Sequence, residues 1–334
     1  DINNLPDDLA GPGRFPGFLL AWAEPQFPIE EPIDFNNLGN PAAQPTSISL
    51  EDVLEDTTFN AGILTTTIAD PFPEGAMMRT VGLQGYFQQE IGEDTVSLHT
   101  PSAVVTVDGD TPRRRLVDDE KCASCHEWFE GHGGNRVYTM DICMMCHVPN
   151  LSSSGRTLDL DYPEDTQNMK DMIHGIHASA VRSTDYEHVR NFRDAARFYN
   201  WSEVTFPAEN GVANCLLCHD GFPELPPMDA LPTTVRTSFS SDGSAESTAE
   251  YAAAREDVPN DGDWINTPVA STCFYCHDTL YAAAHMFQNG AWLSTADGFV
   301  ITNRWMFEEE MTLESCMVCH GEGKIADIEA AHGE

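Results

Sequence analysis

The chain has 334 residues, enough for two domains, and it carries 54 acidic against 17 basic side chains, a net charge of −37. Because phosphate groups are bound by basic surfaces, this charge argues against nucleic acid and against anionic membranes as partners. It is compatible with multivalent cations such as Ca2+, with basic proteins and with mineral surfaces, and it keeps a secreted protein soluble.

Residues 1–45 predict an extended, acidic arm. Proline is too frequent here for long helices. Apolar anchors such as Trp22 and Phe27 distinguish the segment from a disordered tail. We therefore expect the arm to lie either on a domain of its own chain or on a neighbouring subunit. Its prolines are Pro6, Pro12, Pro16, Pro25, Pro28, Pro32, Pro41 and Pro45.

Residues 46–112 predict a β-domain, because apolar and polar residues alternate between turns rich in glycine and aspartate. The expected fold is a small antiparallel sandwich or barrel. We interpret His99, which lies within it, as a solvated or hydrogen-bonded side chain. The candidate strands are Asn60 to Ile68, Met78 to Ile91 and Val96 to Val107.

Residues 113–334 contain five copies of the motif Cys-x-x-Cys-His. This motif is the attachment site of c-type haem: its two cysteines form thioethers with the vinyl groups on one porphyrin edge, and its histidine ligates the iron. One copy alone could be half of a zinc site or a redox dithiol. Here all ten cysteines fall in such motifs and none is left for a disulfide. The sequence therefore predicts five covalently bound haem c groups.

The thioether residues are Cys122, Cys125, Cys143, Cys146, Cys215, Cys218, Cys273, Cys276, Cys316 and Cys319, and the iron ligands beside them are His126, His147, His219, His277 and His320. With five haems, this span is too short for a conventional core, so we expect short helices and long loops packed on porphyrin. The candidate helices are Thr166 to Val181, Leu280 to Gln288, Leu313 to His320 and Lys324 to His332. Phe222 to Trp264 is expected to be a surface excursion that includes a helix over Ala245 to Glu256.

Seven histidines lie outside the motifs: His99, His132, His174, His177, His188, His285 and His332. A haem with one histidine keeps an open position and can transform a small molecule, whereas a haem with two is closed and mainly moves electrons. Five closed haems need five more histidines, and the chain has enough of them.

His174 and His177 carry the sharpest local signal for second ligands. They are three residues apart in a stretch whose Met169, Met172 and Ile173 belong to an apolar helical face. Two ligands so close together could serve two adjacent haems; the alternative is a pair of core histidines.

Small residues beside three further histidines would let a porphyrin approach. His132 lies between glycines, His285 follows Ala282 to Ala284, and His332 follows two alanines. We therefore predict these three as second ligands as well. His188 has charged neighbours, and we expect it to be exposed.

Several short segments around the motifs together resemble the extracellular multihaem cytochromes of the OmcA/MtrC type. The resemblance covers about 120–334 and implies bis-histidine haems, electron transfer to minerals or soluble shuttles, and a β-barrel-like N-terminal domain. It also matches the same five second ligands. Those proteins usually have two β-domain plus five-haem modules, whereas this chain looks like a single one. The segments are Gly131-His-Gly-Gly-Asn-Arg136, Met172-Ile-His-Gly-Ile-His177, Thr205-Phe-Pro207, Ala284-His-Met286, Gln288-Asn-Gly290 and Cys316-Met-Val-Cys-His-Gly-Glu-Gly-Lys-Ile-Ala-Asp327.

The leading functional hypothesis is an electron conduit rather than an enzyme. We expect it to act outside the cell on metal oxides or soluble shuttles, with other multihaem cytochromes as partners. The alternative is a reductase of nitrite or another small oxyanion with one open haem. No motif has lysine in place of histidine, as the five-haem nitrite reductases have, and a chain of charge −37 repels anions. A third hypothesis is binding or storage of metal ions such as Ca2+ on the acidic surface.

Haem c is attached after export, so we expect a secreted or cell-surface protein that has passed the periplasm and lost its signal peptide. No apolar run reaches the length of a membrane span, and no cysteine near Asp1 offers a lipid anchor. These expectations, the arm and the half-length module together suggest polymerisation into a filament of haems, a nanowire.

Overall fold

The computed structural model describes residues 16–69, 72–154, 164–192, 195–207, 211–221, 230–239, 247–294 and 314–332. The chain divides into two compact units. Unit 1 comprises the chain up to Ala23 together with Pro45–Cys146, and unit 2 comprises Glu24–Gln44 together with the chain from His147 onward. In this division the expected arm is shared between both units, and unit 1 extends past residue 112 to Cys146.

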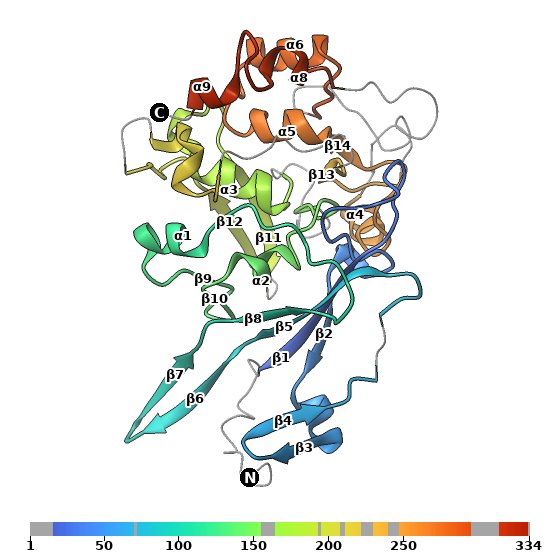
Figure 1. Ribbon diagram of the computed structural model, residues 1–334, viewed down its shortest axis with the longest axis vertical. Helices are drawn as coiled ribbons and strands as arrows, with labels where there is room; N and C mark the ends of the chain where they lie inside the picture. Colours follow the sequence, from blue (N-terminus) through green and yellow to red (C-terminus); the bar gives the residue numbers. More distant parts are fainter. Residues whose placement is uncertain are drawn as a thin grey trace. The chain divides into compact units, whose positions relative to one another are not determined.

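Unit 1 is built on a four-stranded antiparallel sheet in the order β2-β1-β5-β8 (Figure 1). Its strands are β1 (Gly17–Ala23), β2 (Thr46–Ser49), β5 (Met77–Gln84) and β8 (Ala103–Thr106). The apolar run of β1 is buried because it lies between two strands, β2 and β5. Residues 17–23 of the expected arm are therefore extended chain that packs as a strand on a domain of their own chain.

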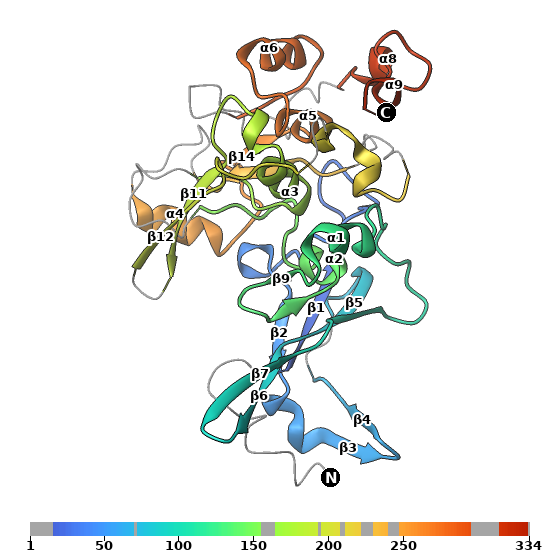
Figure 2. The same cartoon turned by 90° about the vertical axis from the view of Figure 1, so that its left-hand side faces the viewer.

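Three antiparallel hairpins complete the strands of unit 1. The β6–β7 hairpin continues β5 and β8 beyond the sheet (Figures 1 and 2). The predicted antiparallel strands are confirmed, but one sheet with hairpins is a more open arrangement than the sandwich or barrel that we expected. The hairpins are β3 (Thr57–Asn60) with β4 (Ile63–Thr66), β6 (Tyr86–Ile91) with β7 (Asp94–His99), and β9 (Glu130–Gly131) with β10 (Arg136–Val137).

The sheet has an apolar cluster in which Leu20, Ile48 and Val53 are buried; Val53 comes from the 3-10 helix η4 (Glu51–Asp56). Helix α2 (Met140–Met144) lies against β5 at Gly82, where a Cβ atom would stand 2.5 Å from the Met145 sulfur. A larger residue here would have to displace the ends of the Met145 and Ile142 side chains, so glycine allows the close approach of helix to strand.

The described part of unit 2 contains short helices, as the sequence predicts, and two-stranded hairpins, which the sequence analysis did not expect. Leu280–Gln288 forms a helix with the predicted bounds, and the helix expected over Thr166 to Val181 is shorter, followed by the 3-10 turn η5 (Ser179–Val181). Leu313, the expected start of another helix, lies outside the described residues. The helices are α3 (Met169–His177), α4 (Thr248–Arg255), α5 (Pro268–Phe274), α6 (Leu280–Gln288), α8 (Met317–His320) and α9 (Ile328–His332), and the hairpins are β11 (Glu187–Phe192) with β12 (Ala195–Asn200) and β13 (Thr233–Arg236) with β14 (Trp264–Asn266).

Part of the segment expected to be a surface excursion is buried instead. Thr237 Oγ1 and the Ser238 N–H both donate to Asp263 Oδ1, and all three residues are buried. The Arg255 guanidinium is buried as well and donates to the Ser152 carbonyl. The polar composition misled the prediction because these side chains bond to one another rather than to water.

The remaining part of the expected arm packs within unit 2. The Gln26 and Asn150 side-chain amides exchange two hydrogen bonds of 3.1 and 2.7 Å, and Asn36 Nδ2 donates to the Glu24 carbonyl. Packing on its own chain, one of the two alternatives for the arm, therefore holds for the described residues between 16 and 45. No helix in the described ranges combines the length and the apolar character needed to cross a bilayer.

Candidate functional site

In three of the motifs, a backbone hydrogen bond closes one helical turn between the first cysteine and the histidine. The His219 N–H donates to the Cys215 carbonyl at 2.9 Å, and the His277 N–H donates to the Cys273 carbonyl at 2.7 Å. The same bond at 2.9 Å joins His320 to Cys316. Residues four apart lie on one helix face, so each histidine stands beside its first cysteine. That is the arrangement in which one porphyrin edge can meet both thiols while its iron meets the imidazole.

The ten cysteines are free thiols, none of them in a disulfide. Burial raises the pKa of the Cys143 thiol to about 12 and that of the Cys273 thiol to about 12. Both thiols are therefore neutral at neutral pH. The donor set fits thioether attachment of haem c.

Three motif histidines each face one predicted second ligand. Ring centroids lie 6.3 Å apart for His174 and His219, 6.0 Å for His277 and His332, and 6.1 Å for His285 and His320. A metal ion bound about 2 Å from one nitrogen of each of two opposed imidazoles places the ring centroids roughly 6 Å apart. The three pairs therefore fit an iron held between two histidines.

In two of the paired histidines and in His177, Nδ1 of the ring is held by a backbone carbonyl. Nδ1 lies 2.9 Å from the Ala326 oxygen in His320, 3.1 Å from the Ile328 oxygen in His332, and 2.9 Å from the Ile173 oxygen in His177. A histidine that donates Nδ1–H to a carbonyl presents Nε2 as the metal ligand, with its ring orientation fixed.

Helix α3 carries both His174 and His177, as the sequence predicts, and the Asn168 side chain caps it. A Cβ atom on Gly175 would lie 2.8 Å from the Tyr186 ring, so two bulky neighbours, Tyr186 and Tyr275, pack directly on the helix backbone. Burial and the neighbouring His219 lower the pKa of His174 to about 3. His174 is therefore neutral, the form that binds a metal.

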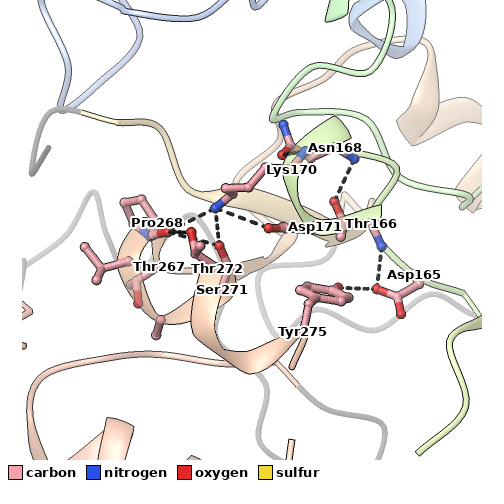
Figure 3. Close-up of polar contacts among 12 residues, drawn as sticks. Asp165, Thr166, Asn168, Lys170, Asp171, Thr267, Pro268, Ser271, Thr272 and Tyr275 are labelled. Atoms are coloured by element: carbon pink, nitrogen blue, oxygen red, sulfur yellow. Dashed lines mark hydrogen bonds and ion pairs between the residues drawn. The ribbon is translucent and has the colours of Figure 1, made fainter. Parts of the chain in front are cut away.

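Lys170 ties α3 to α5, the helix that carries Cys273 (Figure 3). Its ammonium group donates to the Pro268 carbonyl at 3.0 Å and to the Ser271 hydroxyl at 2.5 Å, and it lies 3.2 Å from the buried Asp171 carboxylate. The helix that presents second ligands is thereby fixed against the helix of the fourth motif.

Two carboxylates make further links between these elements. The Tyr275 hydroxyl donates to Asp165, whose pKa burial raises to about 6 (Figure 3). Asp278, next to His277, accepts from the backbone N–H groups of Ser183 and Thr184 at 2.7 and 2.8 Å. The chain after α3 is thus held at the fourth motif.

Two of the alanines before His285 pack against α5. Ala283 is buried in a cluster with Ala270 of α5 and Met286, and Ala282 packs against the same cluster. The small residues let α6 approach α5. His285 itself lies exposed on the last turn of α6, and its role as a second ligand stays a prediction.

In unit 1, His126 ends helix α1 (Asp119–His126), and His132 lies in the turn between β9 and β10 with φ 57°; both are exposed. The role of His132 as a second ligand stays a prediction. His99 is held by hydrogen bonding, as interpreted: its Nδ1 lies 3.0 Å from the Gly134 oxygen, and its ring packs on Tyr86 with centroids 4.7 Å apart.

The expectation that His188 is exposed is wrong. Its exposed fraction is 7%, and its ring stacks on Tyr199 with centroids 5.0 Å apart. Burial, Arg190 and His147 lower the pKa of His188 to about 4, so His188 is neutral. The signal that could have revealed it is strand alternation, because Tyr186 and His188 are two apart along the chain and side chains at that spacing share a face of a strand.

Within the described ranges, no group of three or more histidine, cysteine or acidic side chains could hold a metal ion by itself. A search of curated proteins found no match. Among solved structures, the chain is similar to MtrC from Shewanella baltica OS185, with 17% sequence identity, a TM-score of 0.45, and coverage of 91% of this chain and 45% of that one. The chain thus spans less than half the length of that relative.

Residues 114–333, which hold every Cys-x-x-Cys-His motif and all three histidine pairs, match the family described as outer membrane cytochrome MtrC/MtrF-like, domains II/IV. This match covers most of the chain. The chain therefore belongs to the family of MtrC/MtrF-like outer membrane cytochromes.

Proposed function

We propose that the chain is an electron-transfer protein with five haem c groups, each iron closed by two histidines, that passes electrons outside the cell. The observation that carries the proposal is the set of three histidine pairs with ring centroids 6.0 to 6.3 Å apart. Bound haem c supplies reversible one-electron chemistry at its iron. Two opposed imidazoles hold the iron on both faces and leave no position for a substrate.

The chain's own contribution is to fix the ligands in place. Backbone carbonyls orient the rings of His320, His332 and His177. Lys170 holds α3 against α5, so the elements around the third and fourth motifs cannot shift independently. A fixed ligand shell requires little rearrangement when an electron arrives or leaves, which suits conduction.

The alternative, a reductase of nitrite or a similar oxyanion, needs one iron with an open position. All five motifs end in histidine, and a protein of charge −37 repels anionic substrates. The acceptors that we propose are instead extracellular metal oxides, soluble shuttles or other multihaem cytochromes. Ca2+ on the acidic surface would lessen repulsion at such contacts.

Polymerisation into a filament remains a separate prediction. The described part of residues 1–45 does not support it, because β1 lies inside the sheet of unit 1 and Gln26, Asn36 and Phe35 are buried in unit 2. Sedimentation of the purified protein with and without Ca2+ tests it: growth of large species with Ca2+ supports a filament, and a monomer at high concentration contradicts it.

The proposed function is tested by stopped-flow oxidation of the fully reduced protein. We expect ferric oxide particles and a soluble quinone to oxidise all five haems, while nitrite oxidises none and cyanide causes no spectral change. Rapid oxidation by nitrite, or cyanide binding at one haem, would instead favour the reductase.

A further inference from the structure

We propose that His188 is the second iron ligand of the haem carried by Cys143, Cys146 and His147. The proposal rests on the proposed function, since it assumes that this iron is closed by two histidines. It assigns a residue that the sequence analysis had set aside as exposed.

The first step is the position of His188. Its exposed fraction is 7%, and Tyr186 two residues earlier is fully buried, with its hydroxyl donating to the Thr166 carbonyl at 2.8 Å. Tyr186 and His188 share one side of the chain, because side chains alternate along a strand. His188 is thereby directed toward the segment that follows Thr166.

The second step is that the same segment holds His147. Nδ1 of His147 lies 2.7 Å from the Gln167 carbonyl oxygen, and the Met169 N–H donates to the His147 carbonyl at 3.0 Å. The Gln167 N–H in turn donates to the Leu151 carbonyl at 2.8 Å. The motif histidine is thus anchored on the strip of backbone that His188 faces.

The third step is that one residue contacts both imidazoles. Gln167 meets Nδ1 of His147 with its carbonyl oxygen, and its side-chain amide nitrogen lies 3.5 Å from Nδ1 of His188. Nε2 of His188 makes no hydrogen bond to any residue that the structure describes. Gln167 therefore lies beside both imidazoles.

The fourth step is that the ring of His188 has a fixed plane. Its cross-strand neighbour in the β11–β12 hairpin is Tyr199, and the two rings stack with planes only 17° apart. A buried imidazole with a held ring and a motif histidine nearby is placed as a ligand rather than as packing.

The assignment also changes which of the predicted histidines are needed as second ligands. His174, His285 and His332 face the third, fifth and fourth motifs. With His188 at the second motif, five irons need only one further second ligand, although both His132 and His177 were predicted as ligands. One of those two histidines is then not a ligand.

The experiment compares His188→Gly and His188→Met with the control His99→Gln, whose parent histidine is held by Gly134. Each variant is first assayed for five covalent haems by pyridine haemochrome. We expect His188→Gly to turn one haem in five high-spin, added imidazole to restore it, and His188→Met to give one methionine-ligated haem with a raised potential. The control should stay entirely low-spin.

A second experiment tests which of the five irons His188 ligates. It combines His188→Gly with Cys143→Ala and Cys146→Ala, which remove the second haem. In this background His188→Gly should produce no high-spin haem. The proposal is overturned if His188→Gly leaves all five haems low-spin, or if a high-spin haem persists without the second motif. A high-spin haem in the unaltered protein would instead count against the proposed function.

Discussion

His285 and His320 face each other with ring centroids 6.1 Å apart and ring planes at 79°. They come from the last turns of two different helices, α6 and α8. His320 is oriented by the Ala326 carbonyl, so the fifth motif and α6 together present two imidazoles that fit the two axial positions of one iron.

Replacing His285 by methionine should give one methionine–histidine haem and raise the potential of the fifth motif's iron, because a thioether stabilises the reduced state. Redox titration with low-temperature EPR measures both effects. Tyr281→Phe is the matched control, since Tyr281 lies on the same helix with an exposed fraction of 89%. An unchanged bis-histidine spectrum in His285→Met would remove His285 from the ligand set.

Gly175→Ala should destabilise the protein by about 1–3 kcal/mol, because the new Cβ has no room. It would stand 2.8 Å from the Tyr186 ring and 3.0 Å from the Tyr275 ring, which forces α3 outward. Denaturant unfolding followed by haem absorbance measures the change in the free energy of unfolding. At Gly221 a Cβ meets nothing within 4 Å, so Gly221→Ala is the control. Equal stability of the two variants would refute the close packing of α3.

Asp263 should make the stability of the protein fall as pH rises. Burial raises its pKa to about 7 although Thr237, Ser238 and Asn260 donate hydrogen bonds to it. The ordinary pKa of an aspartate is 3.8, so between pH 3.8 and about 7 the unfolded chain loses the proton and the folded chain keeps it. The free energy of unfolding then falls by up to about 1.4 kcal/mol per pH unit in this window.

The measurement is denaturant unfolding at a series of pH values for the unaltered protein and for Asp263→Asn. The difference in unfolding free energy between the two proteins should change with pH inside the window and level off above it. A difference that does not depend on pH would show that Asp263 ionises normally in the folded state.

Loss of haem should unfold unit 2 before the sheet of unit 1. The sheet has an apolar cluster around Leu20, Ile48 and Val53, whereas the short helices of unit 2 are expected to pack on porphyrin. Limited proteolysis of chain produced without haem attachment measures the order. A protease-resistant fragment from the second half of the haem-free chain would contradict the prediction.

The sequence predicted the elements whose signals are local. The histidine spacing on α3 and the bounds of α6 follow from helical periodicity and from residues next to them in the chain. The antiparallel strands β5 to β8 follow from alternation in the same way.

Features that depend on distant partners could not be predicted. Proline density suggested an arm, but β1 becomes a strand because β2 and β5 pair with it from later in the chain. Charged neighbours suggested that His188 is exposed, but the segment around Gln167 and the facing Tyr199 bury it. These partners cannot be recognised from the residues that flank β1 or His188 in the sequence.

The measurement that tests the central claim most directly is low-temperature EPR of the oxidised protein, with total haem quantified in the same sample. Five closed irons predict that all five haems per chain appear as low-spin ferric signals and that excess imidazole or cyanide changes none of them. A high-spin signal amounting to one haem or more, or fewer than five haems per chain, would contradict the account.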